Sequence, residues 1–210
     1  MTARRRFRGR IAGVGSGSGV RVVVGWWQES PFGPFADAMV ETADGHRVLL
    51  APTQEVADLV STTYTFDEVR IEPVEVLAGS ADDDAWVRSW GPSSPSLTLT
   101  LEVGGRTGLG QLLRLVPGRL ATSPAFATLT DPVARVALRG VRTRGVAQAG
   151  RREYYGATDV REVTAMTGSF DGTDLGALAP VDPPCRFGFS STPRRPSVTE
   201  VTTTIVETRT

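Results

Sequence analysis

One loop of the chain combines a carboxylate with four large aromatic side chains. It contains Trp26, Trp27, Glu29, Phe32 and Phe35, spaced by proline and glycine. Aromatic walls with a few fixed polar groups are typical of small-molecule sites, and a carboxylate beside indole rings holds its proton more tightly. We therefore expect either a ligand pocket, with Glu29 as a candidate general acid or base, or a rigid loop that plugs one end of the fold.

A second candidate site pairs tryptophan with arginine. Trp86, Arg88 and Trp90 share one face of a short predicted strand, so the Arg88 guanidinium is expected between two indoles, where it could bind an anionic group. The alternative is an arginine that only covers exposed tryptophans beside the acidic run 82–84. The three aspartates of that run lack the alternating spacing of a calcium loop.

A third polar group lies late in the chain. If residues 152–167 form a strand, Tyr155, Asp159 and Arg161 share one face. Facing inward, they could bind a carboxylate or polarise a carbonyl. The opposite face, which carries Val160, looks more like core, so the pattern predicts that the polar face points outward.

The composition removes several kinds of chemistry. The chain has 23 arginines, no lysine and no asparagine, and it has one His and one Cys. A Schiff-base lysine and a metal site needing two imidazoles are therefore excluded, and we expect neither a metal nor a cofactor. His46 flanks a predicted turn and should be exposed, whereas Cys185 alternates with Phe187 and should be buried. Any activity has to use carboxylates, Tyr, Ser, Thr and Arg.

Charge and hydropathy limit the partners. Acidic and basic residues balance at 23 each, and no apolar stretch approaches membrane-spanning length. We therefore predict a cytoplasmic protein without membrane insertion or a specific nucleic-acid partner, and the single cysteine is compatible with a reducing compartment. The oligomeric state is left open.

The first residues concentrate positive charge. Five arginines between residues 4 and 10 precede a Gly/Ser-rich stretch at 13–19, a composition that predicts a disordered basic tail over 1–18. The segment Arg4-Arg5-Arg6-Phe7 also looks like a twin-arginine export element, and a start codon placed too early is a third possibility. Residues 19–210 are expected to form a single β-rich domain.

Period-two alternation dominates that domain. Strands are predicted at 19–27, 35–41, 46–51, 66–77 with a bend at Pro73, 96–103, 152–167, 185–190 and 198–207. Asp44-Gly45 supplies a hairpin turn between the second and third of these. Short helices are predicted at 53–61 and 107–116, a third helix could begin at Pro132, and 117–130 is the longest expected excursion from the sheet. These elements indicate a mainly β fold, an antiparallel barrel or a two-sheet sandwich with two or three short helices.

Two short motifs resemble marks of lipocalin-like barrels. Gly25-Trp26-Trp27 contains a G-x-W triplet, and Thr158-Asp159 stands late in the chain. In that family the triplet opens the first strand, whereas here it closes one, and no aromatic residue follows Thr158-Asp159. The resemblance implies a barrel that holds a small apolar ligand in its interior or mouth.

Three functions remain open. The first is binding of a small apolar or amphipathic molecule in a barrel mouth or cavity, walled by the loop aromatics and oriented by Glu29 or Arg88. The second is an enzyme with Glu29 as proton-transfer group and Arg or Tyr stabilisation, which requires a buried Glu29. The third is an interaction module that docks a partner on exposed aromatics.

Overall fold

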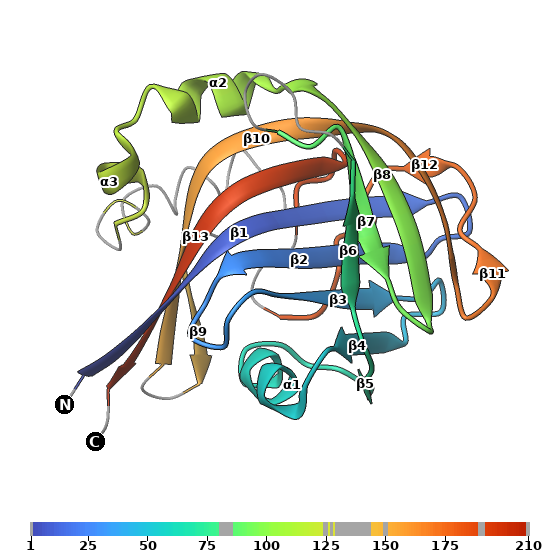
Figure 1. The fold of residues 1–210 in the computed structure, drawn as a ribbon, viewed down its shortest axis with the longest axis horizontal. Coiled ribbons are helices and arrows are strands. Elements are labelled where there is room, and N and C mark those ends of the chain that lie inside the picture. The colour runs from blue at the N-terminus through green and yellow to red at the C-terminus, as the bar shows by residue number, and fades with distance from the viewer. Residues whose placement is uncertain are drawn as a thin grey trace.

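Ten strands form one strongly curled sheet, a half-barrel (Figure 1). The computed structural model describes residues 2–79, 86–123, 126, 128, 144–148, 151–188 and 192–208. The strands of the curl are β1 (Thr2–Ser16), β2 (Arg21–Glu29), β3 (Phe35–Glu41), β4 (Arg47–Ala51), β5 (Glu68–Ile71), β6 (Glu75–Ala78), β7 (Ser89–Ser93), β8 (Leu97–Arg106), β10 (Arg151–Phe170) and β13 (Ser197–Thr208). Their order in the sheet is β5-β4-β3-β2-β1-β13-β10-β8-β7-β6.

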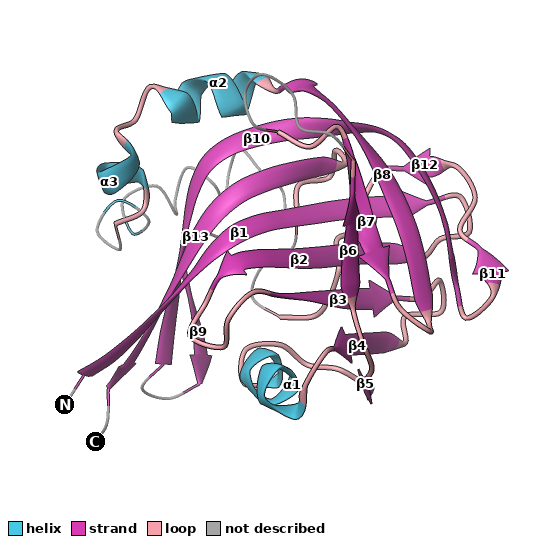
Figure 2. Cartoon of the chain, viewed as in Figure 1, coloured by secondary structure: helices cyan, strands magenta, loops and turns pink. Residues whose placement is uncertain are grey.

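Neighbouring strands in this order are antiparallel, except for the parallel pair β4 and β5. Short strands extend the sheet beside this path: β9 (Arg144–Gln148) and β11 (Thr173–Asp174) pair with β10, and β12 (Leu178–Ala179) pairs with β1. Among the described residues, the helices are α1 (Gln54–Ser61), α2 (Gly108–Arg114) and α3 (Gly118–Ala121), all at the periphery of the sheet (Figure 2). The prediction of a mainly β, largely antiparallel fold with short helices is thus confirmed, with a half-barrel as its form.

The two ends of the sheet order are consecutive in the chain. Strands β5 and β6 are separated only by residues 72–74, and this one segment pairs with β4 at one end of the curl and with β7 at the other. The break lies at Pro73, where the sequence predicts a bend, because proline cannot donate a ladder hydrogen bond. Arg70 secures the segment through an ion pair with Asp171 whose N···O distance is 2.6 Å.

The inside of the curl is filled with side chains. Buried residues of β1 to β4 meet buried residues of β7, β8 and β10 in one hydrophobic core, where Val24, Trp90 and Leu101 are at most 1% exposed. Strands β3 and β7 contact each other although they lie far apart in the sheet order. Strand alternation divides β2 between its two faces: Val24 points into this core and Val23 points to the opposite face.

The opposite face is covered by α1 and by residues 181–188. Val56 and Ala57 of α1, with Val181, Cys185 and Phe187, form a second core there. Thr53 caps the helix by accepting a hydrogen bond from the Val56 N–H, which fixes the start that the sequence predicts. Cys185 is buried, as predicted, but residues 185–188 are irregular rather than a strand, and 189–190 lie outside the described residues.

The N-terminal segment corrects one prediction. Residues 2–16 form β1, a strand paired on one side with β2 and on the other with β13, in place of the expected disordered tail over residues 1–18. Ala12 and Val14 are buried in the core inside the curl, and Phe7 is buried in a separate cluster with Leu59 and Ile205. Four of the five arginines, at positions 4, 6, 8 and 10, alternate along the strand, and Arg6 donates to the Thr122 hydroxyl oxygen over 3.0 Å. Partners distant in the sequence therefore order a segment whose composition is typical of disorder.

Most predicted elements between residues 19 and 116 are confirmed. Helix α2 begins after the N-cap Thr107, and the hairpin turn at Asp44-Gly45 has Gly45 at a φ of 92°. The helix proposed from Pro132 and the aspartates 82–84 lie outside the described residues. Helix α3 falls inside the predicted excursion 117–130.

Candidate functional site

A cavity of about 190 Å³ lies on the face of the sheet opposite the filled core. Its floor is built by β1, β2, β3, β10 and β13, and its cover by α1, residues 63–64 and residues 187, 192 and 193. The wall is mainly apolar, with the rings of Phe7, Trp27, Phe35, Tyr64, Tyr155 and Phe187 and the aliphatic side chains of Ile11, Val23, Met39, Leu59, Val60, Val201 and Ile205.

Strand alternation explains why these side chains converge. Val23, Gly25 and Trp27 of β2 occupy every second position, as do Phe35, Asp37 and Met39 of β3. The antiparallel register pairs Gly25 with Asp37 and Trp27 with Phe35, so the two sets share one face. The cavity is therefore a product of sheet register rather than of a single loop.

Hydrogen bonds and an ion pair to one buried carboxylate hold the cover of the cavity in place. Glu41 of β3 is fully buried, and it accepts hydrogen bonds from the Arg186 N–H over 2.7 Å and from Arg186 Nε over 3.0 Å. Arg21 of β2 forms an ion pair with the same carboxylate over 3.1 Å. The Thr65 N–H donates to the Phe187 carbonyl oxygen over 2.7 Å, which ties the cover to the segment after α1.

Asp37 is the acidic residue that β3 contributes to the cavity. Its side chain is buried, and Oδ1 accepts a hydrogen bond from the Trp27 indole Nε1 over 2.9 Å. Gly25 makes this contact possible, because a Cβ atom there would lie 2.5 Å from Asp37 Oδ1 and 2.6 Å from Trp27 Nε1. Burial raises the pKa of Asp37 from 3.8 to about 7, and the Trp27 hydrogen bond limits that rise.

A chain of hydrogen bonds lines the opposite wall. The Tyr64 and Tyr155 hydroxyl oxygens are 2.5 Å apart, the Tyr155 hydroxyl donates to Glu153 Oε2 over 3.1 Å, and Thr63 donates to Glu153 Oε1. Burial and the nearby carboxylate of Glu153 raise the pKa of Tyr64, and burial with the neighbouring Tyr64 raises the pKa of Tyr155. Both phenols therefore remain protonated at neutral pH and act as hydrogen-bonding groups.

The electrostatic character of the cavity is acidic. The described residues that line it include two carboxylates and two phenols but no Arg or His. The ionised form of Asp37 also raises the pKa of Tyr64, which places the two groups within electrostatic reach of each other. Such a site can accept hydrogen bonds from a ligand, hold a positive charge, or transfer a proton near neutral pH.

Comparisons with protein-family models, with curated proteins and with solved structures find no match to this chain. The interpretation of the site therefore rests on its geometry and chemistry.

The structure separates the residues of the predicted aromatic site. Trp27 and Phe35 line the cavity, whereas Trp26 faces the filled core and lies 5.3 Å from the Trp90 ring. Phe32 is 36% exposed and lies outside the cavity lining, although its ring centroid is 6.3 Å from that of Phe7. The segment thus contributes two walls of the cavity, not a complete pocket.

Glu29 does not occupy the environment that acid or base catalysis needs. Its side chain is 70% exposed and it forms a surface ion pair with Arg8 over 3.3 Å. The proton-transfer role expected for Glu29 required a buried carboxylate, and the structure places that property on Asp37 instead. The physical reason is position: Glu29 ends β2 beyond the covered part of the sheet.

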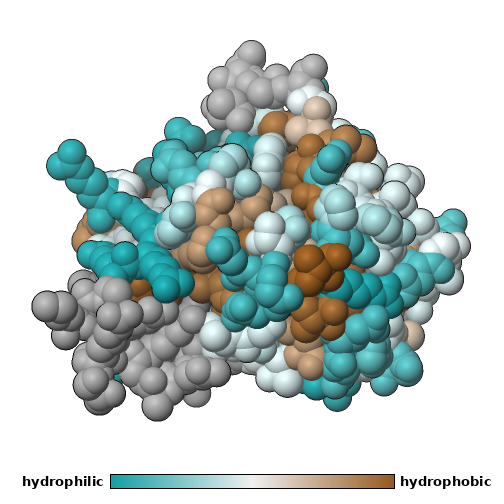
Figure 3. Space-filling view, turned by 60° about the horizontal axis from the view of Figure 1, so that its bottom comes forward, coloured by the Kyte–Doolittle hydropathy of each residue, from teal (hydrophilic) through white to brown (hydrophobic). Residues whose placement is uncertain are grey.

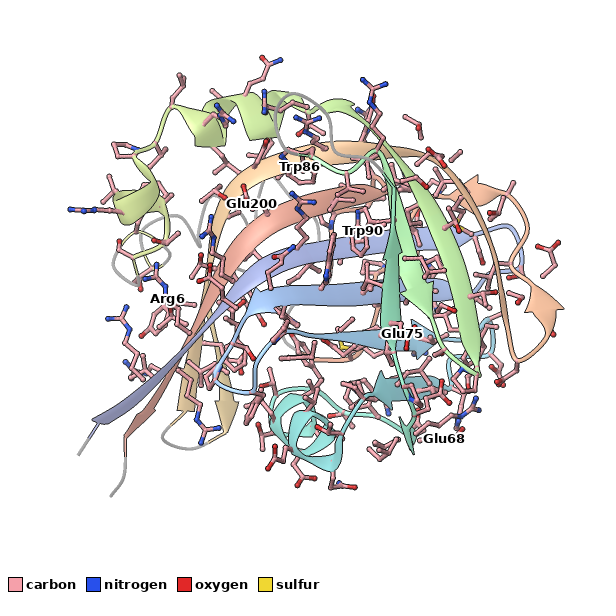
Figure 4. All side chains as sticks on the ribbon, in the orientation of Figure 1. Arg6, Glu68, Glu75, Trp86, Trp90 and Glu200 are labelled. Carbon is pink, nitrogen blue, oxygen red and sulfur yellow. The ribbon has the colours of Figure 1, made fainter. Side chains whose placement is uncertain are left out.

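The tryptophan and arginine cluster exists, but with other arginines. Trp86 and Trp90 are buried inside the curl (Figure 4), whereas Arg88 between them in the chain is exposed. The guanidinium carbons of Arg10 and Arg161 lie 4.3 and 4.9 Å from the Trp86 ring centroid. Cation–π contact therefore stabilises a buried indole, and Arg88 lies apart from the cavity.

The polar run in β10 corrects a further prediction. A register shift between Ala157 and Asp159 reverses the alternation, so Tyr155 faces the cavity while Arg161 faces the core inside the curl. Asp159 and Arg161 are buried rather than directed outward, and Asp159 accepts a hydrogen bond from Arg106 over 2.9 Å. Strict period-two reasoning fails at a bulge because one extra residue flips all later side chains.

Sequence reasoning missed Asp37, Glu153 and Tyr64 as site residues. For Asp37 a signal was available, since it alternates with Phe35 and Met39 and so shares their apolar face. For Glu153 and Tyr64 the signal was absent, because the helix end and β10 meet only in the folded chain. His46 is exposed, as predicted, and lies 3.2 Å from Glu68.

Other surfaces carry less chemistry. Figure 3 shows hydrophobic atoms gathered in small groups between hydrophilic ones, and exposed apolar side chains include Val69 and Ile71 of β5 and Leu112 and Leu115 near α2. Within the described residues, no cluster of three metal-binding side chains occurs, and no helix has the length and apolar character to cross a membrane.

Proposed function

We propose that this protein binds a small, mainly apolar molecule in the cavity between β1, β2, β3, β10, β13 and α1. The observation that carries the proposal is a covered apolar cavity whose buried carboxylate Asp37 has no cationic partner among the described residues. Apolar walls with a few convergent polar groups are the usual composition of a small-molecule site.

The volume restricts the ligand. A cavity of roughly 150 Å³ in a protein interior can hold benzene. At about 190 Å³, the present cavity fits a single ring with a short substituent. The apolar wall would bind the ring, and Asp37, Tyr64, Tyr155 and Glu153 would orient the substituent.

The proposal keeps the small-molecule binding that the sequence favours, including its lipocalin-like interpretation, but changes the location. The inside of the curl is occupied by Trp90, Leu101 and their neighbours. We therefore place the ligand on the opposite face of the sheet, under α1 and residues 187, 192 and 193, and assign no binding role to Trp26, Glu29, Phe32 or Arg88.

Benzene binding and native mass spectrometry test the proposal. Ligand-observed NMR with benzene should show binding to the wild-type protein, and native mass spectrometry of protein purified without added ligand reports any molecule that copurifies. Ala157→Phe places a ring in the cavity, because Ala157 lines it. Ala165→Phe makes the same change at an exposed position of the same strand.

We expect Ala157→Phe to abolish the benzene signal and Ala165→Phe to preserve it. Circular dichroism and urea unfolding establish that both variants are folded. Equal benzene signals in wild type and a folded Ala157→Phe variant would show that benzene binds elsewhere, and no binding to wild type would contradict an accessible apolar cavity.

A second candidate function is carboxylate acid–base catalysis at the same cavity. It is favoured by the pKa of about 7 of Asp37, since proton transfer is most effective when the pKa of the catalytic group lies near the working pH. Tyr64 and Tyr155 would donate hydrogen bonds to developing negative charge. The test is metabolite consumption from a cell extract, followed by mass spectrometry: turnover lost in Asp37→Asn but kept in Glu29→Gln supports catalysis.

A further inference from the structure

The cavity contains aromatic rings and carboxylates, but none of the described residues that line it is a cation. In the part of the chain that the structure describes, the ionisable groups that line it are Asp37 on β3, Tyr64 after α1, and Glu153 and Tyr155 on β10. Asp37 uses Oδ1 to accept the Trp27 hydrogen bond, and no described residue donates to its second oxygen. A buried carboxylate with an open oxygen is costly unless a donor or a positive charge meets it.

On the opposite face of the same sheet, the chain itself places cationic side chains against an aromatic ring. There, the Trp86 indole lies under the guanidinium groups of Arg10 and Arg161, 4.3 and 4.9 Å from its centroid. The cavity has the rings of Trp27, Phe35 and Tyr64 beside a carboxylate, yet no arginine is found among its described lining residues. The complementary group is therefore one that a ligand has to bring.

We infer that the cavity selects a small monocationic amine on a ring-sized apolar body, with its ammonium group at Asp37 and against the neighbouring aromatic faces. This inference rests on the proposed function, because it names the ligand class of the same cavity. An ammonium group donates to the open carboxylate oxygen and gains cation–π attraction from the rings. An anionic ligand would instead meet Asp37 and Glu153, which share its sign.

If an ammonium group binds at Asp37, the affinity for the amine should depend on pH. A bound ammonium stabilises the carboxylate form of Asp37, whose pKa of about 7 in the empty site then falls, so binding near neutral pH releases a proton. The facing phenols of Tyr64 and Tyr155 have raised pKa values and stay protonated, and Glu153 is hydrogen-bonded by Thr63 and Tyr155. Amine affinity should therefore rise with pH up to about 7 and level above it.

The test compares three probes of nearly equal shape by isothermal titration calorimetry at pH 8: benzylamine, benzyl alcohol and benzoate. We expect benzylamine to bind at least about tenfold more tightly than benzyl alcohol, since one charged hydrogen bond supplies that factor, and benzoate to bind most weakly. Asp37→Asn should reduce benzylamine affinity to that of the alcohol. Glu29→Gln, which removes an exposed carboxylate, is the matched control and should leave benzylamine affinity unchanged.

The outcomes separate this inference from the proposed function. If benzyl alcohol binds as tightly as benzylamine, or if Asp37→Asn leaves benzylamine affinity unchanged, the selection of a cation is wrong while binding in the cavity stands. If no probe binds and benzene also fails to bind, both proposals fail. A benzylamine affinity that does not change between pH 5.5 and pH 8 would likewise overturn the role of Asp37.

Discussion

Strand β3 carries two buried carboxylates on the same face, and the protein treats them in opposite ways. Glu41 is met by Arg21 and by both the main chain and the side chain of Arg186. Asp37, four residues earlier, is met by a single indole N–H from Trp27. Both side chains are at most 5% exposed, so burial alone does not distinguish them.

The difference separates a structural acid, Glu41, from an acid that is free to bind a ligand or a proton, Asp37. Glu41 joins β2, β3 and the cover segment through an ion pair and hydrogen bonds, so removing its carboxylate should strongly destabilise the protein. Asp37 lies at a cavity, and its ionised form is left with one donor, which explains a pKa near 7. Proteins keep an uncompensated buried acid at a cost in stability, and such groups cluster at functional sites.

The largest expected effect comes from breaking the compensated acid. Glu41→Gln leaves Arg21, whose side chain is 7% exposed, as a buried charge without its carboxylate. We expect the free energy of unfolding to fall by about 3–5 kcal/mol, because removing one partner of a buried ion pair strands the other. Urea unfolding monitored by tryptophan fluorescence measures the change.

Glu29→Gln provides the contrast for that measurement. Its surface ion pair with Arg8 has both side chains more than half exposed, so the loss should stay within about 0.5 kcal/mol. A Glu41→Gln variant as stable as Glu29→Gln would mean that Arg21 and Arg186 contribute little to holding the cover.

The second prediction concerns Asp37, where removing the carboxylate should stabilise the protein at neutral pH rather than destabilise it. The pKa of Asp37 is about 7 in the folded protein and near 3.8 when unfolded, so between these values the folded state binds more protons. The contribution of Asp37 to stability therefore falls as pH rises from about 4 to 7, by about 4 kcal/mol in all, and levels above 7. Asp37→Asn removes this dependence.

We expect Asp37→Asn to be about 1 kcal/mol less stable than wild type at pH 4 and about 3 kcal/mol more stable at pH 8, because the buried amide costs the same at both pH values while only the ionised acid carries the loss of about 4 kcal/mol. Urea unfolding at pH 4, 6 and 8 gives the three differences. A constant difference at all three pH values would show that Asp37 does not change its proton occupancy on folding.

The fold was largely predictable because strand signals are local. The alternation in residues 35–51 and 96–103 specifies a buried face, and the structure confirms β3, β4 and β8 there. Strand β1 was missed because its order depends on β2 and on β13, which begins some 180 residues later. The phase error in β10 has a related cause, since the bulge that moves Arg161 inward depends on pairing with β13.

The candidate site was less predictable because it is assembled across the chain. Trp27 and Phe35 were found from local aromatic density, and they do line the cavity. Asp37 was the acid to choose over Glu29, because Asp37 lies between the apolar residues Phe35 and Met39 of its alternation, whereas Glu29 follows the last apolar residue of its own. The contact between Tyr64 and Tyr155, 91 positions apart, has no local signal.

The smallest expected effect concerns the hydrogen bond from the Trp27 indole to Asp37. Trp27→Phe removes the indole donor, so the pKa of Asp37 should rise above 7, and carboxyl-carbon NMR measures it. The substitution also disturbs ring contacts with Phe7 and Phe35. A double-mutant cycle with Asp37→Asn cancels those contacts, and it should give a coupling of about 1 kcal/mol at pH 8 that declines at pH 5. An unchanged pKa in Trp27→Phe would mean that the indole does not stabilise the carboxylate, and the contrast with Glu41 would then be between three donors and none.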